Sequence, residues 1–417
     1  MNHPSPVTPG QFSLFRIIFG TYLAAHFASQ LPHAVELFSG AGVLPDPRLN
    51  PLYGLFPNPL AVWDSPAFTL GFVCALLGLS VAFTLGVWRR TTAALLWFGW
   101  AALFHRNNLI ANPSLPYVGV TLLFCAIVPA GEPWSVSGRG RRPSAWFFPV
   151  AAFWGAWLLM AAGYSTSGWI KLSSPSWIDG TAFLHLLENP LARPGFARDA
   201  LLSLPTWGHA AFTWAALAIE IAFLPMCFFR AGRLIVWTAI VAMHLGILVT
   251  VEFADLSFGM VMIHLFTFDA RWFPPRQDAR RPVLLYDGEC GLCNGVLRFL
   301  MREDAGGRLH YAALQSDAAR GYLQRHGMST TDFDSIVFVP DWNDQTAGKH
   351  RLRTDGVLAA LDEIGGVWRV AAFLRVIPAP LRDPFYKIVA RLRYQLFGEY
   401  RPSPWPEPHW ADRVLAK

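Results

Sequence analysis

The sequence contains little charge and little cysteine for its length. Only 15% of its 417 residues are charged and 53% are hydrophobic, whereas an average soluble domain carries about 25% charged residues. Five cysteines are too few for a disulfide-stabilised scaffold. The net charge of +6 is not gathered on any recognisable nucleic-acid-binding module, so we expect no nucleic acid among the partners.

The charged residues that are present are sparse up to about residue 280 and dense after it. The first part contains a series of apolar runs, and a helix needs about 20 such residues to cross a bilayer core of roughly 30 Å. No positive cluster precedes the first run, which favours a membrane helix over a cleaved signal peptide. The runs cover residues 12–30, 67–88, 91–106, 115–131, 147–172, 208–229, 233–251 and 254–268. They predict an α-helical polytopic membrane bundle of about eight transmembrane helices, surrounded by the lipid bilayer.

Arginines in alternate loops predict the orientation of this bundle. Loops rich in Lys and Arg face the cytoplasm in most membrane proteins. The basic loops contain Arg89 and Arg90; Arg139, Arg141 and Arg142; Arg230 and Arg233; and Arg271, Arg276, Arg280 and Arg281. We therefore expect an integral protein of a plasma membrane, such as the inner membrane of a bacterium, with the N-terminus and the C-terminal domain in the cytoplasm.

Several ionisable side chains lie inside the apolar runs, where an uncompensated charge costs at least about 2.5 kcal/mol. They are Arg16, His26, Glu220, His244 and His264. Two interpretations stay open, a polar pocket and a structural network between helices, and an interfacial place is open for His26 and His264. Lys171, at the end of the fifth run, either extends its ammonium group to the lipid headgroups or, when desolvated, acts as a base.

Two segments of the membrane part resemble a known family. The first reads Ser167-Gly168-Trp169-Ile170-Lys171-Leu172, followed by Trp177-Ile178-Asp179-Gly180, and the second passes through Glu220, Arg233 and His244 to Asp255-Leu256-Ser257-Phe258-Gly259-Met260. From residue 12 to 272 the chain resembles the horizontally transferred transmembrane (HTTM) domain of the vitamin K-dependent gamma-glutamyl carboxylases.

The resemblance implies that Lys171 deprotonates a quinol. It also implies that His244, Glu220 and Trp177 help to bind a cofactor, which would be a quinone or a lipid. The histidine of the carboxylase motif is absent from the stretch between Asn107 and Tyr117. The resemblance therefore favours a quinone-like or lipid ligand over glutamate carboxylation.

The C-terminal part begins with a short apolar run, Val283–Tyr286, which predicts a buried strand. The turn Asp287-Gly288-Glu289 follows, and Cys290-Gly291-Leu292-Cys293 then opens a helix. Further strands are predicted near 309–313, 335–339 and 349–353, with helices near 316–326, 355–364, 367–375 and 381–397. This order predicts a small thioredoxin-like α/β domain.

The spacing of Cys290 and Cys293 predicts thiol–disulfide chemistry. Two cysteines three residues apart on the first turn of a helix are close enough to form a disulfide, and the positive end of the helix stabilises a thiolate. Cys290 is then the attacking nucleophile and Cys293 resolves the mixed disulfide. Asp287 either caps the helix or shuttles a proton. We expect no metal, because zinc needs about four ligands and no second Cys/His pair lies at a suitable spacing.

This domain resembles the DCC family of thiol–disulfide oxidoreductases, which is named for an Asp-x-x-Cys-x-x-Cys motif. The matching segments are Tyr286 to Asn294, Leu314-Gln315-Ser316, Ile377-Pro378, Leu381-Arg382-Asp383 and Arg393-Tyr394. A further cysteine often follows the last pair, but Arg401-Pro402-Ser403-Pro404 stands here, so no third redox thiol is expected. The expected domains are an HTTM/carboxylase-like transmembrane domain at 1–278, a redox domain at 279–400 and an extended, Pro-rich tail at 401–417.

Three functions remain open from the sequence. The first is a membrane-anchored thiol–disulfide oxidoreductase that acts on a thiol-containing protein or a small thiol and is coupled to a quinone or lipid in the membrane domain. The second is a carboxylase-like membrane enzyme in which Lys171 is a base acting on a quinol or a peptide. The third is a non-enzymatic membrane scaffold in which Cys290 and Cys293 sense the redox state.

Overall fold

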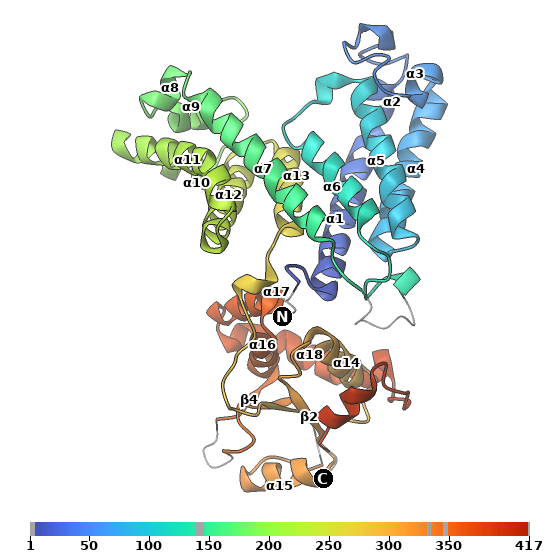
Figure 1. Ribbon diagram of the computed structural model, residues 1–417, viewed down its shortest axis with the longest axis vertical. Helices are drawn as coiled ribbons and strands as arrows, with labels where there is room; N and C mark the ends of the chain where they lie inside the picture. Colours follow the sequence, from blue (N-terminus) through green and yellow to red (C-terminus); the bar gives the residue numbers. More distant parts are fainter. Residues whose placement is uncertain (1–4, 139–145, 332, 334, 345–348, 416–417) are drawn as a thin grey trace. The chain divides into compact units, whose positions relative to one another are not determined.

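The computed structural model describes residues 5–138, 146–331, 333, 335–344 and 349–415. The chain forms two compact units, a helical one built from residues between 9 and 268 and a second one built mainly from residues 269–417 (Figure 1). The helical unit contains the predicted bundle, and the second unit contains the paired cysteines.

Each predicted apolar run folds as a helix. These helices are α1 (Pro9–Gln30), α4 (Pro66–Leu85), α5 (Arg89–Arg106), α6 (Leu115–Ile127), α7 (Val150–Lys171), α11 (Thr206–Cys227), α12 (Arg230–Thr250) and α13 (Ala254–Phe266). Among the described residues, three helices, α4, α11 and α12, are long and apolar enough to cross a membrane, and α6 and α13 are shorter apolar helices. Eight membrane crossings therefore stay a prediction.

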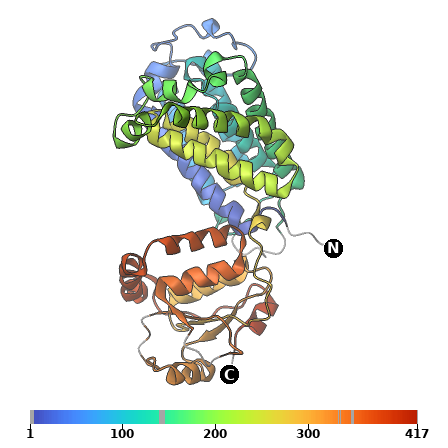
Figure 2. The ribbon, with the colours of Figure 1, turned by 90° about the vertical axis from the view of Figure 1, so that its left-hand side faces the viewer.

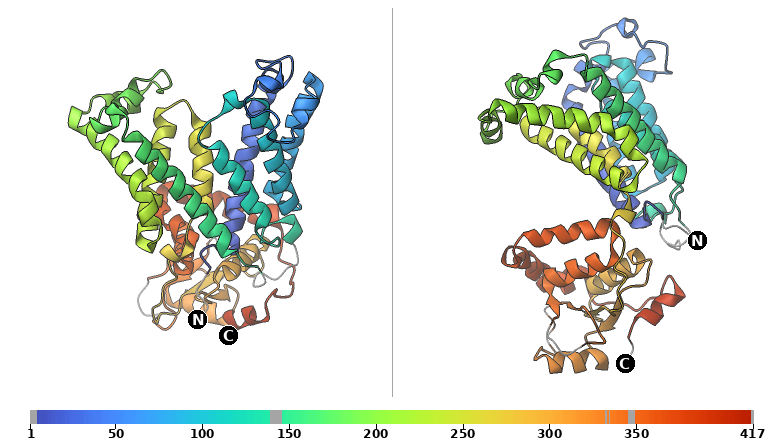
Figure 3. Two further views of the ribbon diagram at one scale, coloured as in Figure 1. Left: turned by 45° about the horizontal axis from the view of Figure 1, so that its top comes forward. Right: turned by 60° about the vertical axis from the view of Figure 1, so that its left-hand side comes forward.

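The long helices of this unit pack as a connected series of neighbours (Figure 3). Helix α1 packs against α4 and α13, and α5 packs against α4 and α6. Helix α7 packs along α11, while α13 contacts both α12 and α6. The short helices α2 (Ala34–Phe38), α3 (Pro59–Val62), α8 (Pro175–Ile178), α9 (Ala182–Glu188) and α10 (Phe196–Leu202) lie in the connections between the long ones.

A buried ion cluster holds one end of the bundle together. The carboxylate of Glu132 accepts hydrogen bonds from Arg89 at 3.2 and 3.1 Å, and Nε of Arg16 lies 3.3 Å from it. All three side chains are buried, and Arg89 also donates to the Val128 carbonyl at 2.8 Å, just beyond the last residue of α6. These contacts support the structural-network interpretation of Arg16.

The same cluster changes the basis of the predicted orientation. Arg89 and Arg233 were counted among the loop charges, but both side chains are buried within the unit. Arg139, Arg141 and Arg142 lie outside the described residues. The cytoplasmic orientation therefore stays a prediction, and fewer exposed loop arginines support it than the sequence suggests.

The second unit is built on a four-stranded mixed sheet (Figure 2). Its strands are β1 (Val283–Tyr286), β2 (His310–Ala313), β3 (Val337–Val339) and β4 (Arg351–Leu352), in the order β2-β1-β3-β4. Strands β1 and β2 are parallel, with Val283 opposite His310, whereas β1 with β3 and β3 with β4 are antiparallel. The helices are α14 (Gly291–Glu303), α15 (Asp317–Arg325), α16 (Arg353–Ile364), α17 (Gly366–Val370) and α18 (Ala379–Phe397). The four predicted strands have counterparts in the structure, and so do the predicted helices, except that the helix expected near 367–375 is the short α17 followed by the 3-10 helix η7 (Ala371–Val376).

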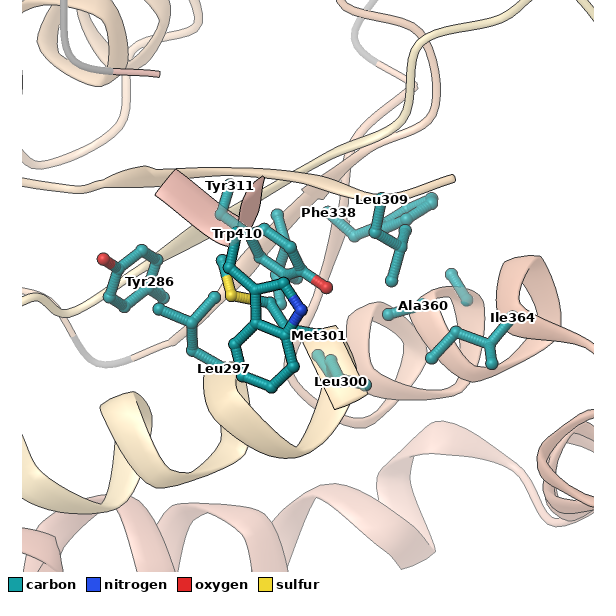
Figure 4. Close-up of a cluster of buried hydrophobic side chains, with 12 residues drawn as sticks. Tyr286, Leu297, Leu300, Met301, Leu309, Tyr311, Phe338, Ala360, Ile364 and Trp410 are labelled. Carbon is teal, nitrogen blue, oxygen red and sulfur yellow. The ribbon is translucent and has the colours of Figure 1, made fainter. Parts of the chain in front are cut away.

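Alternate strand residues fill the two faces of this sheet, as the pleat requires. Figure 4 shows the cluster on one face, where Tyr286, Tyr311 and Phe338 pack with residues of α14 and α16. On the other face Leu285 and Ala312 pack with residues of α15. The sheet is therefore buried on both faces, and the end of β1 leads directly to the paired cysteines.

The predicted Pro-rich tail contributes to the same core. Trp410, in the short 3-10 helix η8 (Pro408–Arg413), is only 3% exposed and lies in the cluster of Figure 4. Arg413 donates to the carbonyl of Leu309 at 3.0 Å and also bonds the Asp304 carboxylate. The tail is thus not extended throughout, because its end folds back onto the sheet.

Candidate functional site

Helix α14 begins directly after Cys290, so the first cysteine takes the N-cap position. Its sulfur accepts a hydrogen bond from the Cys293 N–H at 3.4 Å. The first N–H groups of a helix have no partner inside the helix, and they carry partial positive charge. Both cysteines are free thiols in this structure. The cap geometry places the positive end of α14 at the sulfur of Cys290.

The two thiols have unequal surroundings. Burial raises the pKa of Cys293 to about 12, and the neighbouring sulfur of Cys290 adds to the effect. The backbone N–H of Cys293 donates to the sulfur of Cys290, whereas, among the described residues, the sulfur of Cys293 accepts no such hydrogen bond from the start of α14. A negative charge on the pair is therefore better accommodated at Cys290 than at Cys293.

Asp287 does not cap α14, which corrects one of the two roles expected for it. Its side chain accepts hydrogen bonds from the Glu289 N–H at 3.1 Å and from Gln315 at 2.9 Å. It also accepts from Arg393 at 2.9 Å and from the Tyr394 hydroxyl at 2.7 Å. Burial alone would raise the pKa of Asp287, but these donors outweigh it and lower the pKa below its usual value. Asp287 is therefore a fixed carboxylate that holds its neighbours in place.

Three of these donors lie in segments that carry the resemblance to the DCC family, although the sequence alone assigns them no role. Gln315 follows β2, whereas Arg393 and Tyr394 lie on α18, more than 100 residues after Asp287. A buried carboxylate needs several donors. If Asp287 is expected to be buried, its need for donors points to the polar residues of the other motif segments, Gln315, Arg393 and Tyr394.

A segment after α18, Gly398–Tyr400, covers the first cysteine. The Gly291 N–H donates to the Gly398 carbonyl at 3.0 Å, and the Tyr400 N–H donates to the Glu289 carbonyl at 2.7 Å. Gly398 adopts a φ of 64°, which favours glycine. Cys290 lies between these two hydrogen bonds, and its side chain is 0% exposed. We call Gly398–Tyr400 the covering segment.

Cys293 borders a cavity instead. The cavity has a volume of about 230 Å³ and lies between β1, α14, α16 and α18. Its lining is mostly apolar and includes Leu284, Val296, Ile336, Val357, Val389 and Ala390. Asp287 and Arg393 are the charged residues in this lining. The half-buried residue Cys293 therefore lines an apolar space with one cation, Arg393, at its wall.

In the helical unit, the structure brings Lys171, Glu220 and Trp177 together. The Lys171 ammonium lies 2.5 and 2.6 Å from the two carboxylate oxygens of Glu220 and 4.4 Å from the ring centre of Trp177. Glu220 is buried, and Lys171 turns toward it. In this structure the ammonium group of Lys171 is therefore bound to Glu220, which gives Glu220 a specific partner.

His244 belongs to a different polar group. The Tyr164 hydroxyl lies 3.0 Å from Nε2 of His244 and 3.0 Å from Nε2 of His264. His264 is 0% exposed, so its ring lies in the interior of the helical unit. Tyr164 was not identified from the sequence, because a tyrosine in an apolar run looks like an ordinary interfacial or core residue.

His26 joins a third polar group, with Asp255 as its centre. The Asp255 carboxylate contacts Nδ1 of His26 at 2.8 Å, the Tyr22 hydroxyl at 2.9 Å and the Asn112 amide at 3.2 Å. Within the described ranges, no three His, Cys, Asp or Glu side chains are grouped so that they could hold a metal ion.

Comparison with known proteins identifies the families to which the two parts of the chain belong. A family model described as an HTTM domain matches residues 5–272, and one described as a DCC1-like thiol-disulfide oxidoreductase matches residues 284–399. The uncharacterized protein YuxK of Bacillus subtilis (strain 168) is 32% identical over 133 residues, which are 32% of this chain and 93% of YuxK. The DCC family protein At1g52590, chloroplastic, of Arabidopsis thaliana is 34% identical over 123 residues, which are 29% of this chain and 68% of that protein. No solved structure matches the chain. The chain therefore belongs to the HTTM domain family in its N-terminal part and to the DCC1-like thiol-disulfide oxidoreductase family in its C-terminal domain.

Proposed function

We propose that the protein is a membrane-anchored thiol–disulfide oxidoreductase in which Cys290 and Cys293 alternate between dithiol and disulfide. The family supports a redox role in general. The observation that carries the proposal is the N-cap geometry, in which the Cys293 N–H points at the sulfur of Cys290 at the positive end of α14. The substrate would be a thiol-containing protein or a small thiol.

The fold supports this proposal in finer detail. A mixed sheet of order β2-β1-β3-β4, with the first cysteine between β1 and α14 and the second on the first turn of α14, is what a thioredoxin-like domain requires. The HTTM domain and its apolar helices would anchor this domain to a plasma membrane, with the redox domain in the cytoplasm. Helices α6 and α13 have 13 residues each, which is too short to cross a bilayer core of about 30 Å. In this proposal they are packed among the longer helices and do not each span the bilayer.

The contact between Lys171 and Glu220 favours a second activity in the helical unit. Lys171, Glu220 and Trp177 place an amine, a carboxylate and an aromatic face together. Such a group would bind a quinone or lipid ring and move a proton at its oxygen. His244 would act through Tyr164 rather than through Lys171. This second candidate can be tested apart from the cysteines.

The first candidate is tested by trapping in the full-length chain. We expect Cys290→Ser and Cys293→Ser each to abolish the two-electron redox transition, because no internal disulfide can form. At least one of the single variants is expected to accumulate a stable mixed disulfide through its remaining cysteine, and the double variant to accumulate none. The measurement is a redox titration by thiol alkylation and mass spectrometry.

Cys74→Ser is the matched control, since Cys74 is an exposed free thiol on α4 outside the site. It should leave the transition unchanged. Absence of any internal disulfide in the oxidised wild-type chain would remove the proposal. A reversible transition without turnover of added thiols would instead support a non-enzymatic redox sensor.

A further inference from the structure

The two sulfurs of the pair face different surroundings. The backbone on either side of Cys290 is hydrogen-bonded to the covering segment, and its side chain has no exposed surface. Cys293 is half-buried and borders the apolar cavity between α14 and α18. A substrate approaching the folded domain therefore meets Cys293 before Cys290.

We infer that substrate thiols enter this cavity and attack Cys293 of the oxidised pair, and that the cavity accepts a large apolar side chain beside the substrate cysteine. The inference rests on the proposed oxidoreductase function and reverses the roles expected from the sequence. Cys290 becomes the leaving sulfur, which suits its position as the N-cap of α14. Disulfide exchange is faster when the leaving thiol is the better-stabilised anion.

The reaction proceeds in two steps. A substrate thiolate attacks Sγ of Cys293, a bond forms between these sulfurs, and the Cys290–Cys293 bond breaks with its electron pair remaining on Sγ of Cys290. A second substrate thiolate then attacks the substrate sulfur of the mixed disulfide. The electron pair of that broken bond stays on Sγ of Cys293, which takes a proton from solvent. The two substrate thiols are oxidised to a disulfide, and the pair is reduced.

Arg393 gives the cavity its attraction for an anionic sulfur. Asp287 and the Phe333 carbonyl hold one nitrogen of its guanidinium group, and the side chain is nine-tenths buried. Among the described residues, Nε of Arg393 is buried and has no hydrogen-bond partner. An unpaired buried donor on a cation at the wall of the cavity favours an incoming thiolate.

The size and lining of the cavity identify the other part of the substrate. A volume of about 230 Å³ lies below the roughly 300–1,000 Å³ of sites that enclose whole small-molecule ligands. The apolar lining penalises the charged groups of small hydrophilic thiols. A single large apolar side chain next to a peptide cysteine satisfies both conditions.

The test uses the oxidised full-length chain and two peptides, N-acetyl-Phe-Cys-amide and N-acetyl-Gly-Cys-amide. Acid quenching and mass spectrometry locate the peptide on one of the two cysteines. We expect it on Cys293, with the phenylalanine peptide reacting about tenfold faster or more, because its ring is buried in the cavity. Ala390→Trp, which fills the cavity, should remove that advantage, whereas Gln324→Trp on the exposed side of α15 should not.

A peptide found on Cys290, or equal rates for the two peptides with the wild-type chain, would overturn the inference even if Ala390→Trp does not fold. Failure of the proposed function gives a different result, because neither peptide would then be joined to either cysteine.

Helix α18 also provides a second, independent observation. Tyr386, Val389, Ala390 and Arg393 point into the cavity. A row of large apolar residues is exposed along this helix, with helical spacing from Leu381 to Leu396, and it continues from exposed residues just before the helix. These residues are Phe373, Leu374, Val376, Ile377, Leu381, Phe385, Ile388, Leu392, Leu396 and Phe397. Soluble monomers rarely expose so long an apolar row.

We propose that this row lies on a lipid surface. The exposed residues Lys387 and Arg391 are on the same helix, and a basic amphipathic helix binds the interface of a membrane that contains anionic lipids. A lipid surface is always near, because the same chain carries α4, α11 and α12, which are long enough to cross a bilayer.

A fluorescent probe attached at Phe385→Cys tests whether the row contacts lipid. The chain is placed in nanodiscs that contain phosphatidylglycerol and hold one copy of the protein each. The background carries serine at Cys74, Cys290 and Cys293, and the control probe is at Gln324→Cys on α15. We expect headgroup-labelled quencher lipids to quench the probe at residue 385 and not the probe at 324. A shielded probe that no lipid quencher reaches would indicate a protein contact and overturn the proposal, as would equal quenching at both positions.

Discussion

Asp287→Ala is expected to destabilise the C-terminal domain by roughly 3–5 kcal/mol, the cost of leaving a buried charge without its partner. The substitution removes the carboxylate that binds Arg393, Tyr394 and Gln315, while Arg393 stays buried and Gln315 half-buried. The midpoint of thermal unfolding, followed in the full chain by maleimide labelling of the otherwise buried Cys290, should fall by about 10 °C or more.

Asp317→Ala is the matched control, because Asp317 lies at an exposed helix start and its ion pair with Arg320 is solvated. It should change stability by less than about 0.5 kcal/mol. Asp287→Asn keeps an acceptor and the shape of the side chain, so we expect an intermediate loss. If Asp287→Ala and Asp317→Ala behaved alike, Asp287 would not be the anchor that its contacts indicate.

The pH dependence of stability follows from the same contacts. The donors around Asp287 lower its pKa below the ordinary value of about 3.8. Its contribution is therefore present above that ordinary pKa and is lost as the pH falls through the lower pKa of the folded state. Asp287→Asn should make the domain less sensitive to acid below about pH 4, because no proton is taken up at this position.

Lys171→Met is expected to destabilise the helical unit by roughly 3 kcal/mol, because it leaves the buried Glu220 carboxylate without a cation. Adding Glu220→Gln removes the unpaired charge, so the double variant should recover more than half of the loss. The measurement is a thermal-unfolding series of the detergent-solubilised chain, analysed as a double-mutant cycle. Glu188→Gln, at an exposed ion pair with His185, is the control that should change little.

Lys171→Arg separates structure from chemistry at the same site. A guanidinium keeps the positive charge beside Glu220 but does not lose a proton in proteins. If Lys171 is a base, this variant should stay folded and lose the reaction of an added short-chain quinol. Full retention of that reaction in Lys171→Arg would exclude the second candidate function.

The parts of the fold that depend on local pattern were predictable from the sequence. The run Val283–Tyr286 is apolar throughout, as a strand buried on both faces must be, and the structure has β1 there. The apolar positions of α14 recur at helical spacing, and Leu297, Leu300 and Met301 fill the core (Figure 4). The Cys pair was recognisable because its spacing alone places both sulfurs on one helical turn.

The site itself was only partly predictable, because its contacts join residues far apart in sequence. Asp287 lies 106 residues from Arg393, and Lys171 lies 49 residues from Glu220. No spacing rule connects such pairs. Asp287 looked like a helix cap, yet its carboxylate binds the Glu289 N–H in the turn and leaves the cap to Cys290.

The predicted orientation depends on arginines whose positions in the sequence do not show what surrounds them in the fold. An arginine at the start of a helix reads the same in a sequence whether it faces headgroups or the interior. Arg89 faces the interior, because it donates hydrogen bonds to the Val128 carbonyl just after α6 and to the Glu132 carboxylate. Counting loop charges cannot distinguish the two cases.

Gly291, which follows the first cysteine, allows a close backbone contact that homologues with another residue at this position would lack. A Cβ atom at Gly291 would lie 2.5 Å from the carbonyl oxygen of Phe397 and 3.0 Å from that of Gly398. A protein with a larger amino acid there has no space for its chain to cross so closely above the first sulfur. We therefore expect homologues with glycine after the first cysteine to shelter that sulfur at rest, and homologues with a larger amino acid there to leave it open to reagents.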